Sequence, residues 1–236
     1  MTAPFQECQG CVATPFCKAY SGEAKLSLLT WCRPKLRLDR ALDLAEIPKK
    51  YRNANMYNFQ VDPYNSHIFD EVKPYLDDIE ATVATGKNFF FYGHKTGTGK
   101  TYTAMCLLNQ FIYKTCQTVF DFENPLALYV VYSDLAHDMK FGQFDDQVQA
   151  RFDTLRKVPL LLLDDIGTGN MTDTVRDHTF RLINSRVNDG LSTIVTTNYT
   201  TKELDQDQKL GSRTVSRLFE DAVGLELVGK DRRKLR

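Results

Sequence analysis

The chain has 236 residues, which is enough for one well-buried domain and a small appendage but hardly for two full domains. Its 30 Lys and Arg residues balance its 30 Asp and Glu residues, so the net charge identifies no class of partner. No stretch approaches the ~20 apolar residues that cross a bilayer, and no basic segment followed by an apolar run marks a secretory signal. Both observations predict a cytoplasmic protein.

Residues 1–32 hold four of the six cysteines of the chain and show little apolar periodicity. These four are Cys8, Cys11, Cys17 and Cys32. In a cytosolic protein, cysteines are more often metal ligands or free thiols than disulfides. Four thiolates satisfy tetrahedral Zn²⁺, and a segment this short needs such a metal because it cannot build a core of its own. We therefore predict a zinc-binding module, with His67 as an alternative ligand and with free thiols or an iron–sulfur cluster as alternative states of the cysteines.

Residues 33–63 are typical of a connector, because they are basic up to Arg52 and then rich in Asn and aromatic residues. From residue 64 to residue 236, short apolar runs alternate with helical patterns, which predicts a parallel α/β sheet flanked by helices. The predicted strands are Asn88–Tyr92, Leu128–Tyr132, Leu160–Leu163, Thr193–Thr196 and Leu225–Val228. The predicted helices are Lys100–Lys114, Gln147–Lys157 and Asp173–Asn188, and a capping box of Thr200 and Glu203 predicts one more.

A glycine-rich turn, Gly93–Thr101, lies between the first strand and the first of these helices, which is the context that a phosphate-binding loop requires. Its glycines let backbone N–H groups converge on a phosphate, and the helix N-terminus adds partial positive charge. Lys100 can reach the β- and γ-phosphates of ATP, and the Thr101 hydroxyl can ligate Mg²⁺. The residues expected to bind ATP are Gly93, Thr96, Gly97, Thr98, Gly99, Lys100, Thr101 and Tyr102.

The spacing of this loop departs from the usual pattern. Five residues separate Gly93 from Gly99, where about four are usual. The working core Gly97–Thr101 is intact, so we place the extra residue in the bend that leaves the strand.

Polar side chains end two of the later strands. Asp164 and Asp165 follow an apolar strand, and two adjacent carboxylates are costly at the end of a buried strand unless something pairs with them. MgATP supplies that partner: Asp164 would hold Mg²⁺, and Asp165 would orient and deprotonate the attacking water. Asn198 ends the next strand, where its amide would position the same water. A helix cap and a turn residue are the structural alternatives for the acidic pair and for Asn198.

Basic and aromatic residues occur together after the second strand. Lys140, Phe141 and Phe144 are candidates for stacking on unpaired bases of single-stranded DNA, with inward packing of the phenyl rings as the alternative. The basic segments Arg33–Arg52 and Lys230–Arg236 can likewise follow a phosphate backbone, or form solvated faces.

These motifs together resemble a known family. The phosphate loop, Leu160–Gly167, Ser192–Asn198 and the run Leu210–Leu218 resemble the AAA+ ATPases of the DnaC/DnaI type, which load bacterial and phage replicative helicases. Ile47–Phe59 is similar to the connector of that family, and the likeness extends from about Trp31 onward.

The resemblance implies roles for residues that the ATP motifs alone do not explain. Arg217 would be an arginine finger offered to ATP on a neighbouring subunit, with Arg213 beside it and Arg232 as a second sensor. The chain ends soon after Leu225–Val228, which leaves no room for a helical lid, so we expect an AAA+ domain without a C-terminal lid, and that absence fits helicase loaders. The resemblance also implies a zinc-bearing N-terminal module that contacts the helicase, and self-association through the ATP sites. The alternative for Arg213 and Arg217 is an exposed helix face.

Three functions remain open on this reading. The first is an ATP-dependent loader that binds a ring-shaped replicative helicase of the DnaB type and places it on single-stranded DNA during replication initiation. The second is a transposition-helper ATPase of the IstB type. The third is a nucleotide-gated DNA-binding adaptor whose unusual loop spacing has abolished hydrolysis. The cysteine module and the connector favour the first, and the short N-terminal region favours a phage or mobile-element origin.

Overall fold

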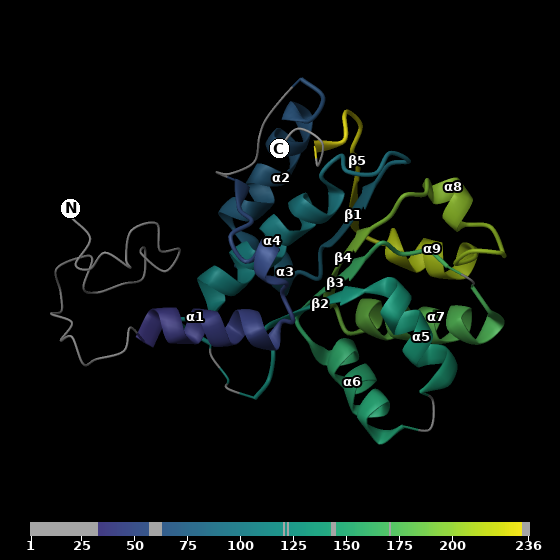
Figure 1. Ribbon diagram of the computed structural model, residues 1–236, viewed down its shortest axis with the longest axis horizontal. Coiled ribbons are helices and arrows are strands. Elements are labelled where there is room, and N and C mark those ends of the chain that lie inside the picture. Colours follow the sequence, from purple (N-terminus) through teal and green to yellow (C-terminus); the bar gives the residue numbers. More distant parts are fainter. Residues whose placement is uncertain are drawn as a thin grey trace, which may run out of the picture.

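The computed structural model describes residues 33–56, 63–119, 121, 123–142, 145–169 and 171–232. The described part contains a sheet of five parallel strands in the order β2-β3-β4-β1-β5 (Figure 1). The strands are β1 (Asn88–Tyr92), β2 (Ala127–Val131), β3 (Leu160–Asp164), β4 (Ser192–Thr196) and β5 (Ala222–Glu226). The predicted parallel α/β architecture is thereby confirmed.

Helices cover both faces of the sheet (Figure 1). One face carries α1 (Arg33–Leu44), α2 (Ser66–Asp77), α3 (Ile79–Ala84) and α4 (Lys100–Thr115). The other carries α5 (Tyr132–Phe141), α6 (Asp146–Lys157), α7 (Asp173–Asn188), α8 (Thr201–Leu204) and α9 (Ser212–Leu218). A 3-10 turn, η3 (Lys49–Tyr51), follows α1. Within the described residues, no helix combines the length and the apolar character that crossing a bilayer demands.

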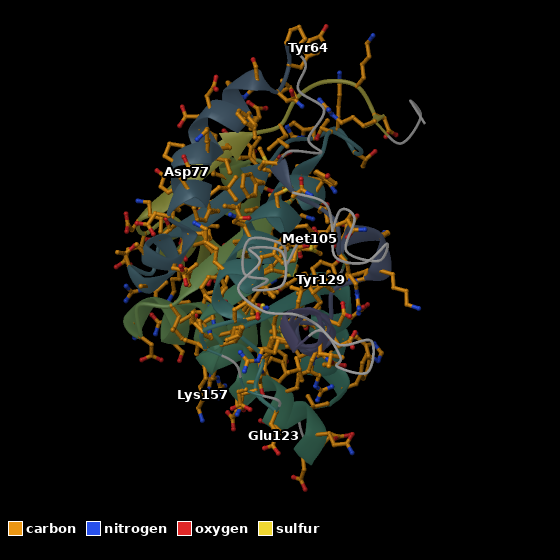
Figure 2. The ribbon with its side chains drawn as sticks, turned by 90° about the vertical axis from the view of Figure 1, so that its left-hand side faces the viewer. Tyr64, Asp77, Met105, Glu123, Tyr129 and Lys157 are labelled. Carbon is orange, nitrogen blue, oxygen red and sulfur yellow. The ribbon has the colours of Figure 1, made fainter. Side chains whose placement is uncertain are left out.

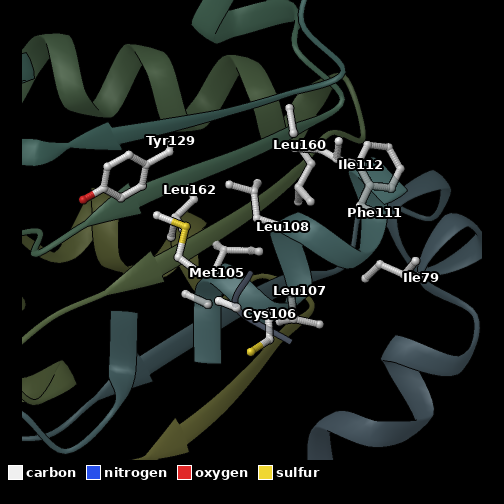
Figure 3. Close-up of a cluster of buried hydrophobic side chains, with 14 of the residues drawn as sticks. Ile79, Met105, Cys106, Leu107, Leu108, Phe111, Ile112, Tyr129, Leu160 and Leu162 are labelled. Carbon is white, nitrogen blue, oxygen red and sulfur yellow. The ribbon is translucent and has the colours of Figure 1, made fainter. Parts of the chain in front are cut away.

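The alternation of side chains along each strand produces two separate cores. In β1, Phe89 and Phe91 pack with the α1–α4 layer, whereas Phe90 packs with the α5–α9 layer. Because successive residues of a strand point to opposite faces, a strand covered on both sides is apolar throughout. Figure 2 shows side chains on the side of the molecule that carries α1 to α4, and Figure 3 shows α4 side chains against those of the sheet.

The segment after β2 differs from the sequence-based expectation. Tyr132 was predicted to end the strand, but it begins α5 without an intervening loop, and Lys140 and Phe141 lie in the last turn of that helix rather than on a loop. The Tyr132 hydroxyl shares a hydrogen bond with Thr179 Oγ1 on α7 (2.7 Å), and Tyr132 is fully buried. This tertiary contact accompanies the early start of the helix, and the local secondary-structure propensity of the sequence does not predict it.

The connector is docked on the helix that follows the phosphate loop. Asn109 of α4 donates from Nδ2 to the carbonyl oxygens of Tyr51 (2.7 Å) and Ala54 (2.9 Å). The hydroxyl of Tyr113, one turn further along α4, donates to the carbonyl of Arg52. Residues 45–56 are thus attached to α4, the helix that begins at Lys100.

A fully buried arginine closes the opposite end of the sheet. Arg186 of α7 donates to the carbonyl oxygens of Leu155 (2.7 Å), Val158 (2.8 Å) and Ser192 (2.5 Å) and to Thr193 Oγ1 (3.0 Å). Burial lowers its pKa to about 9, so the guanidinium stays protonated at neutral pH. It fixes α6, α7 and β4 to one another far from the strand ends that carry Asp164 and Asn198.

Candidate functional site

The phosphate loop connects β1 to α4 at the carboxyl edge of the sheet. Gly97 and Gly99 have φ angles of 75° and 109°, which favour glycine, and Gly99 caps the helix. Lys100 is buried, and its ammonium donates to the carbonyl oxygens of Gly93 and Lys95, both at 2.8 Å. The lysine therefore lies inside the curve of the loop, where a phosphate oxygen can replace these neutral partners.

The segment after β5 packs against this loop. The N–H of Leu227 donates to the Tyr92 carbonyl (2.8 Å), and that of Arg232 donates to the Gly97 carbonyl (3.0 Å). A Cβ atom added at Gly97 would lie 1.8 Å from Asp231 Oδ1. The glycine is thus required by close packing as well as by its φ angle.

Asp164 at the end of β3 accepts hydrogen bonds from three hydroxyl groups. Its Oδ1 accepts from Thr101 Oγ1 (2.8 Å) and from Thr196 Oγ1 (2.6 Å), and its Oδ2 accepts from the hydroxyl of Tyr129 (3.0 Å). Only 8% of Asp164 is exposed. This buried carboxylate is stabilised by neutral donors, with the threonine of the phosphate loop beside it.

Asp165 and Asn198 form a second polar pair. Asp165 has a φ angle of 61°, an uncommon conformation for a residue with a Cβ atom. Its backbone N–H donates to Thr196 Oγ1 (2.9 Å), and its Oδ1 accepts from Asn198 Nδ2 (2.7 Å). Within the described residues, Asn198 Oδ1 is buried without a hydrogen-bond partner. A buried acceptor of this kind is costly unless a donor such as water reaches it.

The bend of the phosphate loop also faces α8. His94 Nε2 lies 3.8 Å from Glu203 Oε2. Glu203 completes the predicted capping box with Thr200, whose N–H donates to Glu203 Oε2 (2.7 Å). Hydrogen bonds from the Thr200 N–H and hydroxyl lower the pKa of Glu203, so this carboxylate is charged at neutral pH.

The structure brings together five residues that the sequence had indicated. Lys100 and Thr101 come from the phosphate loop, Asp164 and Asp165 from the end of β3, and Asn198 from the end of β4. The carboxyl ends of parallel strands meet at one edge of the sheet, which is why residues about sixty positions apart in this sequence converge there.

The remaining predicted residues lie in several places. Thr98 donates to the Lys95 carbonyl (3.4 Å) within the loop, Thr96 is exposed, and Tyr102 of α4 donates to the Asn55 carbonyl (3.4 Å). Arg213 stacks over the Phe180 ring at 4.2 Å, and Arg217 pairs with Glu220 at 2.7 Å, so the observed partners of both arginines lie on the side of the sheet that carries α7 and α9.

The four N-terminal cysteines lie outside the described residues, and among the described residues no cluster of His, Cys, Asp or Glu suits a metal.

Two residues of the site were missed from the sequence, Tyr129 and Thr196. Thr196 lay within a predicted strand, but its contact with Asp164 depends on β3 and β4 being neighbours. The sequence pattern indicates only that Tyr129 is a strand residue, because it does not show that β2 lies next to β3.

Comparisons with known proteins agree with this geometry. The family described as IstB-like ATP binding protein matches residues 28–236. The replicative helicase loader DnaI of Bacillus subtilis (strain 168) is 25% identical over 183 residues, which are 73% of this chain and 55% of that protein. The chain therefore spans little more than half the length of this curated relative.

Solved structures share the fold. The crystal structure of the DnaC helicase loader has a TM-score of 0.64 at 24% identity, covering 77% of this chain and all of that one. The crystal structure of DnaI gives 0.61 at 22% identity, covering 79% and 94%, and AMPPCP-bound DnaA from Aquifex aeolicus gives 0.60 at 23%, covering 78% and 53%. At such identities the likeness shows the AAA+ P-loop fold alone. The match to DnaI confirms the resemblance to the DnaC/DnaI type, and because the family match runs through the connector, the phosphate loop and both polar strand ends, the chain belongs to the IstB-like ATP-binding protein family.

Proposed function

We propose that this chain is an ATPase that binds MgATP at the phosphate loop and hydrolyses it at the ends of β3 and β4. The observation that carries the proposal is the convergence of Lys100, Thr101 and Asp164, with Thr101 Oγ1 2.8 Å from Asp164 Oδ1. Hydroxyl and carboxylate oxygens are the ligands that Mg²⁺ takes in nucleotide sites. The residues present therefore fit this ion and its nucleotide.

The chemistry follows from these positions. Lys100 would exchange the carbonyl oxygens of Gly93 and Lys95 for phosphate oxygens, and Thr101 and Asp164 would hold Mg²⁺. Bound Mg²⁺ supplies positive charge that neutralises the phosphates. Asp165 accepts a proton from the attacking water, and Asn198 holds Asp165 through Nδ2 and can receive the same water at its unpaired Oδ1.

The test is ATP binding and turnover in wild type and in Lys100→Ala. Loss of Lys100 removes the cation that faces the phosphates, so both binding and turnover should fall by at least about 100-fold. Lys157→Ala is the matched control, because Lys157 is an exposed lysine at the C-terminal end of α6 (Figure 2). Wild-type protein that binds ATP tightly but shows no turnover, with or without single-stranded DNA, would support the adaptor function instead.

We propose further that the ATPase serves as a loader of a replicative DNA helicase. The support is the match to the replicative helicase loader DnaI, which runs over 73% of this chain. A pull-down with the replicative helicase of the host should retain this chain in the presence of ATP, and Lys100→Ala should be retained less. If the helicase retains none of this chain with or without ATP, at protein concentrations that support ATPase activity, this role is excluded.

The IstB-like family match supports a second candidate, a transposition-helper ATPase. The same pull-down distinguishes the two when a transposase of the host replaces the helicase as bait. ATP-dependent capture of the transposase alone would favour the second candidate.

Contact with single-stranded DNA is proposed for the end of α5. Phe141 is 65% exposed, and Lys140 Nζ lies 5.0 Å from the centre of its ring. An exposed ring beside a cation can stack on a base while the cation approaches a phosphate. Lys140→Glu should weaken DNA binding and reduce its salt dependence; an unchanged salt slope would remove this surface from consideration. Phe144 lies outside the described residues.

Zinc binding by Cys8, Cys11, Cys17 and Cys32 stays a prediction, because these residues lie outside the described part of the chain. The metal content of the purified protein decides it: about one zinc per chain is expected for a single tetrahedral site, and the value should fall in Cys8→Ser. A metal-free protein would leave the cysteines as thiols.

A further inference from the structure

A buried tyrosine on the edge strand β2 reaches the acidic end of β3. Tyr129 is paired with Leu162 in the parallel register, so its side chain lies on the same face as Leu162 and Asp164. In Figure 3 the Tyr129 ring lies beside Leu162 and Met105, and its hydroxyl points out of this apolar cluster. That hydroxyl donates to Asp164 Oδ2 at 3.0 Å.

This hydrogen bond fixes the carboxylate in one orientation. The terminal torsion of an aspartate is broad, so a carboxylate held through one oxygen can turn about its Cβ–Cγ bond. In Asp164, Oδ1 accepts from Thr101 and Thr196 while Oδ2 accepts from Tyr129. Tyr129 therefore keeps Oδ1, and not Oδ2, directed at the threonine of the phosphate loop.

The surroundings keep the tyrosine a donor. A carboxylate oxygen can only accept, so in the contact with Asp164 Oδ2 the hydroxyl of Tyr129 is the donor. Its backbone is held as well, because the Tyr129 N–H donates to the Ala45 carbonyl (2.9 Å) of the connector. The hydroxyl is thus anchored in a rigid frame.

We propose that Tyr129 is a positioning residue for Asp164. By orienting this carboxylate, Tyr129 sets the affinity of the nucleotide complex for Mg²⁺. The proposal rests on the proposed function, since it concerns the metal that accompanies ATP. Groups that orient a ligand residue commonly change metal affinity by about 10- to 100-fold when they are removed. Tyr129 does not touch the phosphates, so ATP affinity without the metal should not depend on it.

The experiment is a Mg²⁺ titration of fluorescent ATP-analogue binding to the full chain, in wild type and in Tyr129→Phe, with a parallel measurement in EDTA. Tyr129→Phe should raise the Mg²⁺ midpoint by about tenfold and leave the affinity in EDTA within about twofold of wild type. A merely structural role would lower the thermal midpoint without changing the Mg²⁺ dependence.

Tyr132→Phe is the matched control. Tyr132 is also a buried tyrosine, and its hydroxyl is also hydrogen-bonded, but to Thr179 on the other side of the sheet. It should lose stability and keep the wild-type Mg²⁺ midpoint. In an Asp164→Asn background the effect of Tyr129→Phe on that midpoint should vanish.

The outcomes separate this inference from the proposed function. If wild type binds the ATP analogue in a Mg²⁺-dependent manner and Tyr129→Phe has the same midpoint, the positioning role is wrong while the ATPase proposal stands. If wild type binds no nucleotide, the proposed function fails and the positioning role fails with it. An equal shift in Tyr132→Phe would also overturn the role, because the effect would then come from lost packing.

Discussion

Asp165 combines a strained backbone with the position that the proposed function assigns to the base. Its φ angle of 61° lies in the left-handed region, which Asp and Asn tolerate better than other residues that carry a Cβ atom. Such strain persists where the surrounding structure holds it, and here Thr196 and Asn198 do so through the Asp165 N–H and Oδ1. The strained conformation places the carboxylate beside Asn198.

We predict that Asp165→Asn and Asp165→Ala lose turnover alike but differ in stability. Asparagine keeps an acceptor for Asn198 and tolerates the left-handed region, so its free energy of unfolding should stay near wild type. Alanine loses the hydrogen bond and pays the full backbone strain, which should destabilise the fold by about 1–2 kcal/mol. Urea unfolding and ATPase assays on the same preparations measure both effects. Equal stability of the two variants would mean that the strain is absent.

The sequence revealed the site residues whose role depends on a local motif. Lys100 and Thr101 follow from the glycine-rich turn, and Asp164 from a charge that ends an apolar run. Tyr129 and Thr196 were not predictable, because their contacts with Asp164 require the strand order, and strand order depends on packing between distant segments. Local patterns therefore identify the candidate ligand-binding groups but not the neutral residues that are hydrogen-bonded to them.

At the scale of elements, the segment after β5 supports the phosphate loop. Leu227 extends the hydrogen bonding of β5 along β1, and Arg232 continues to Gly97, so the loop is held between α4 and this segment. A side chain at Gly97 would meet both the left-handed φ penalty and the Asp231 carboxylate.

This arrangement predicts unequal costs for three glycine substitutions. Gly169→Ala and Gly190→Ala also have positive φ but meet nothing within 4 Å, so they should cost only the backbone strain, about 1–2 kcal/mol each. Gly97→Ala should lower the thermal midpoint further, because its Cβ overlaps Asp231. Adding Asp231→Ala should recover part of that difference. If the stability changes of Gly97→Ala and Asp231→Ala simply add in the double variant, the contact is not formed in solution.

Element boundaries were predictable where both flanking signals were local. The sequence placed β1 and α7 correctly, since each apolar pattern is bounded by polar or capping residues. It missed α5 because no side-chain cap marks its start and Tyr132 carries the apolar character of the strand into the helix.

At the scale of the whole molecule, the two predicted arginines lie on the layer of helices that carries α7 and α9. Arg217 is paired with Glu220, three residues later, and its side chain is 38% exposed. An exposed ion pair of this kind contributes little to stability and can exchange partners. We therefore propose that Arg217 leaves Glu220 to reach ATP bound by a second copy of the chain.

A mixing experiment tests this assignment. Arg217→Ala keeps its own phosphate loop and Lys100→Ala keeps its own arginine, so each alone should have turnover reduced by about 100-fold or more. An arginine supplied by a neighbour predicts that the mixture recovers turnover, because an intact site can then form between unlike subunits. Arg181→Ala, which removes an exposed arginine paired with Asp177 on α7, should behave as wild type. Turnover in the mixture that equals the sum of the separate variants would show that Arg217 does not act between subunits, and wild-type turnover in Arg217→Ala alone would leave it as part of a solvated face.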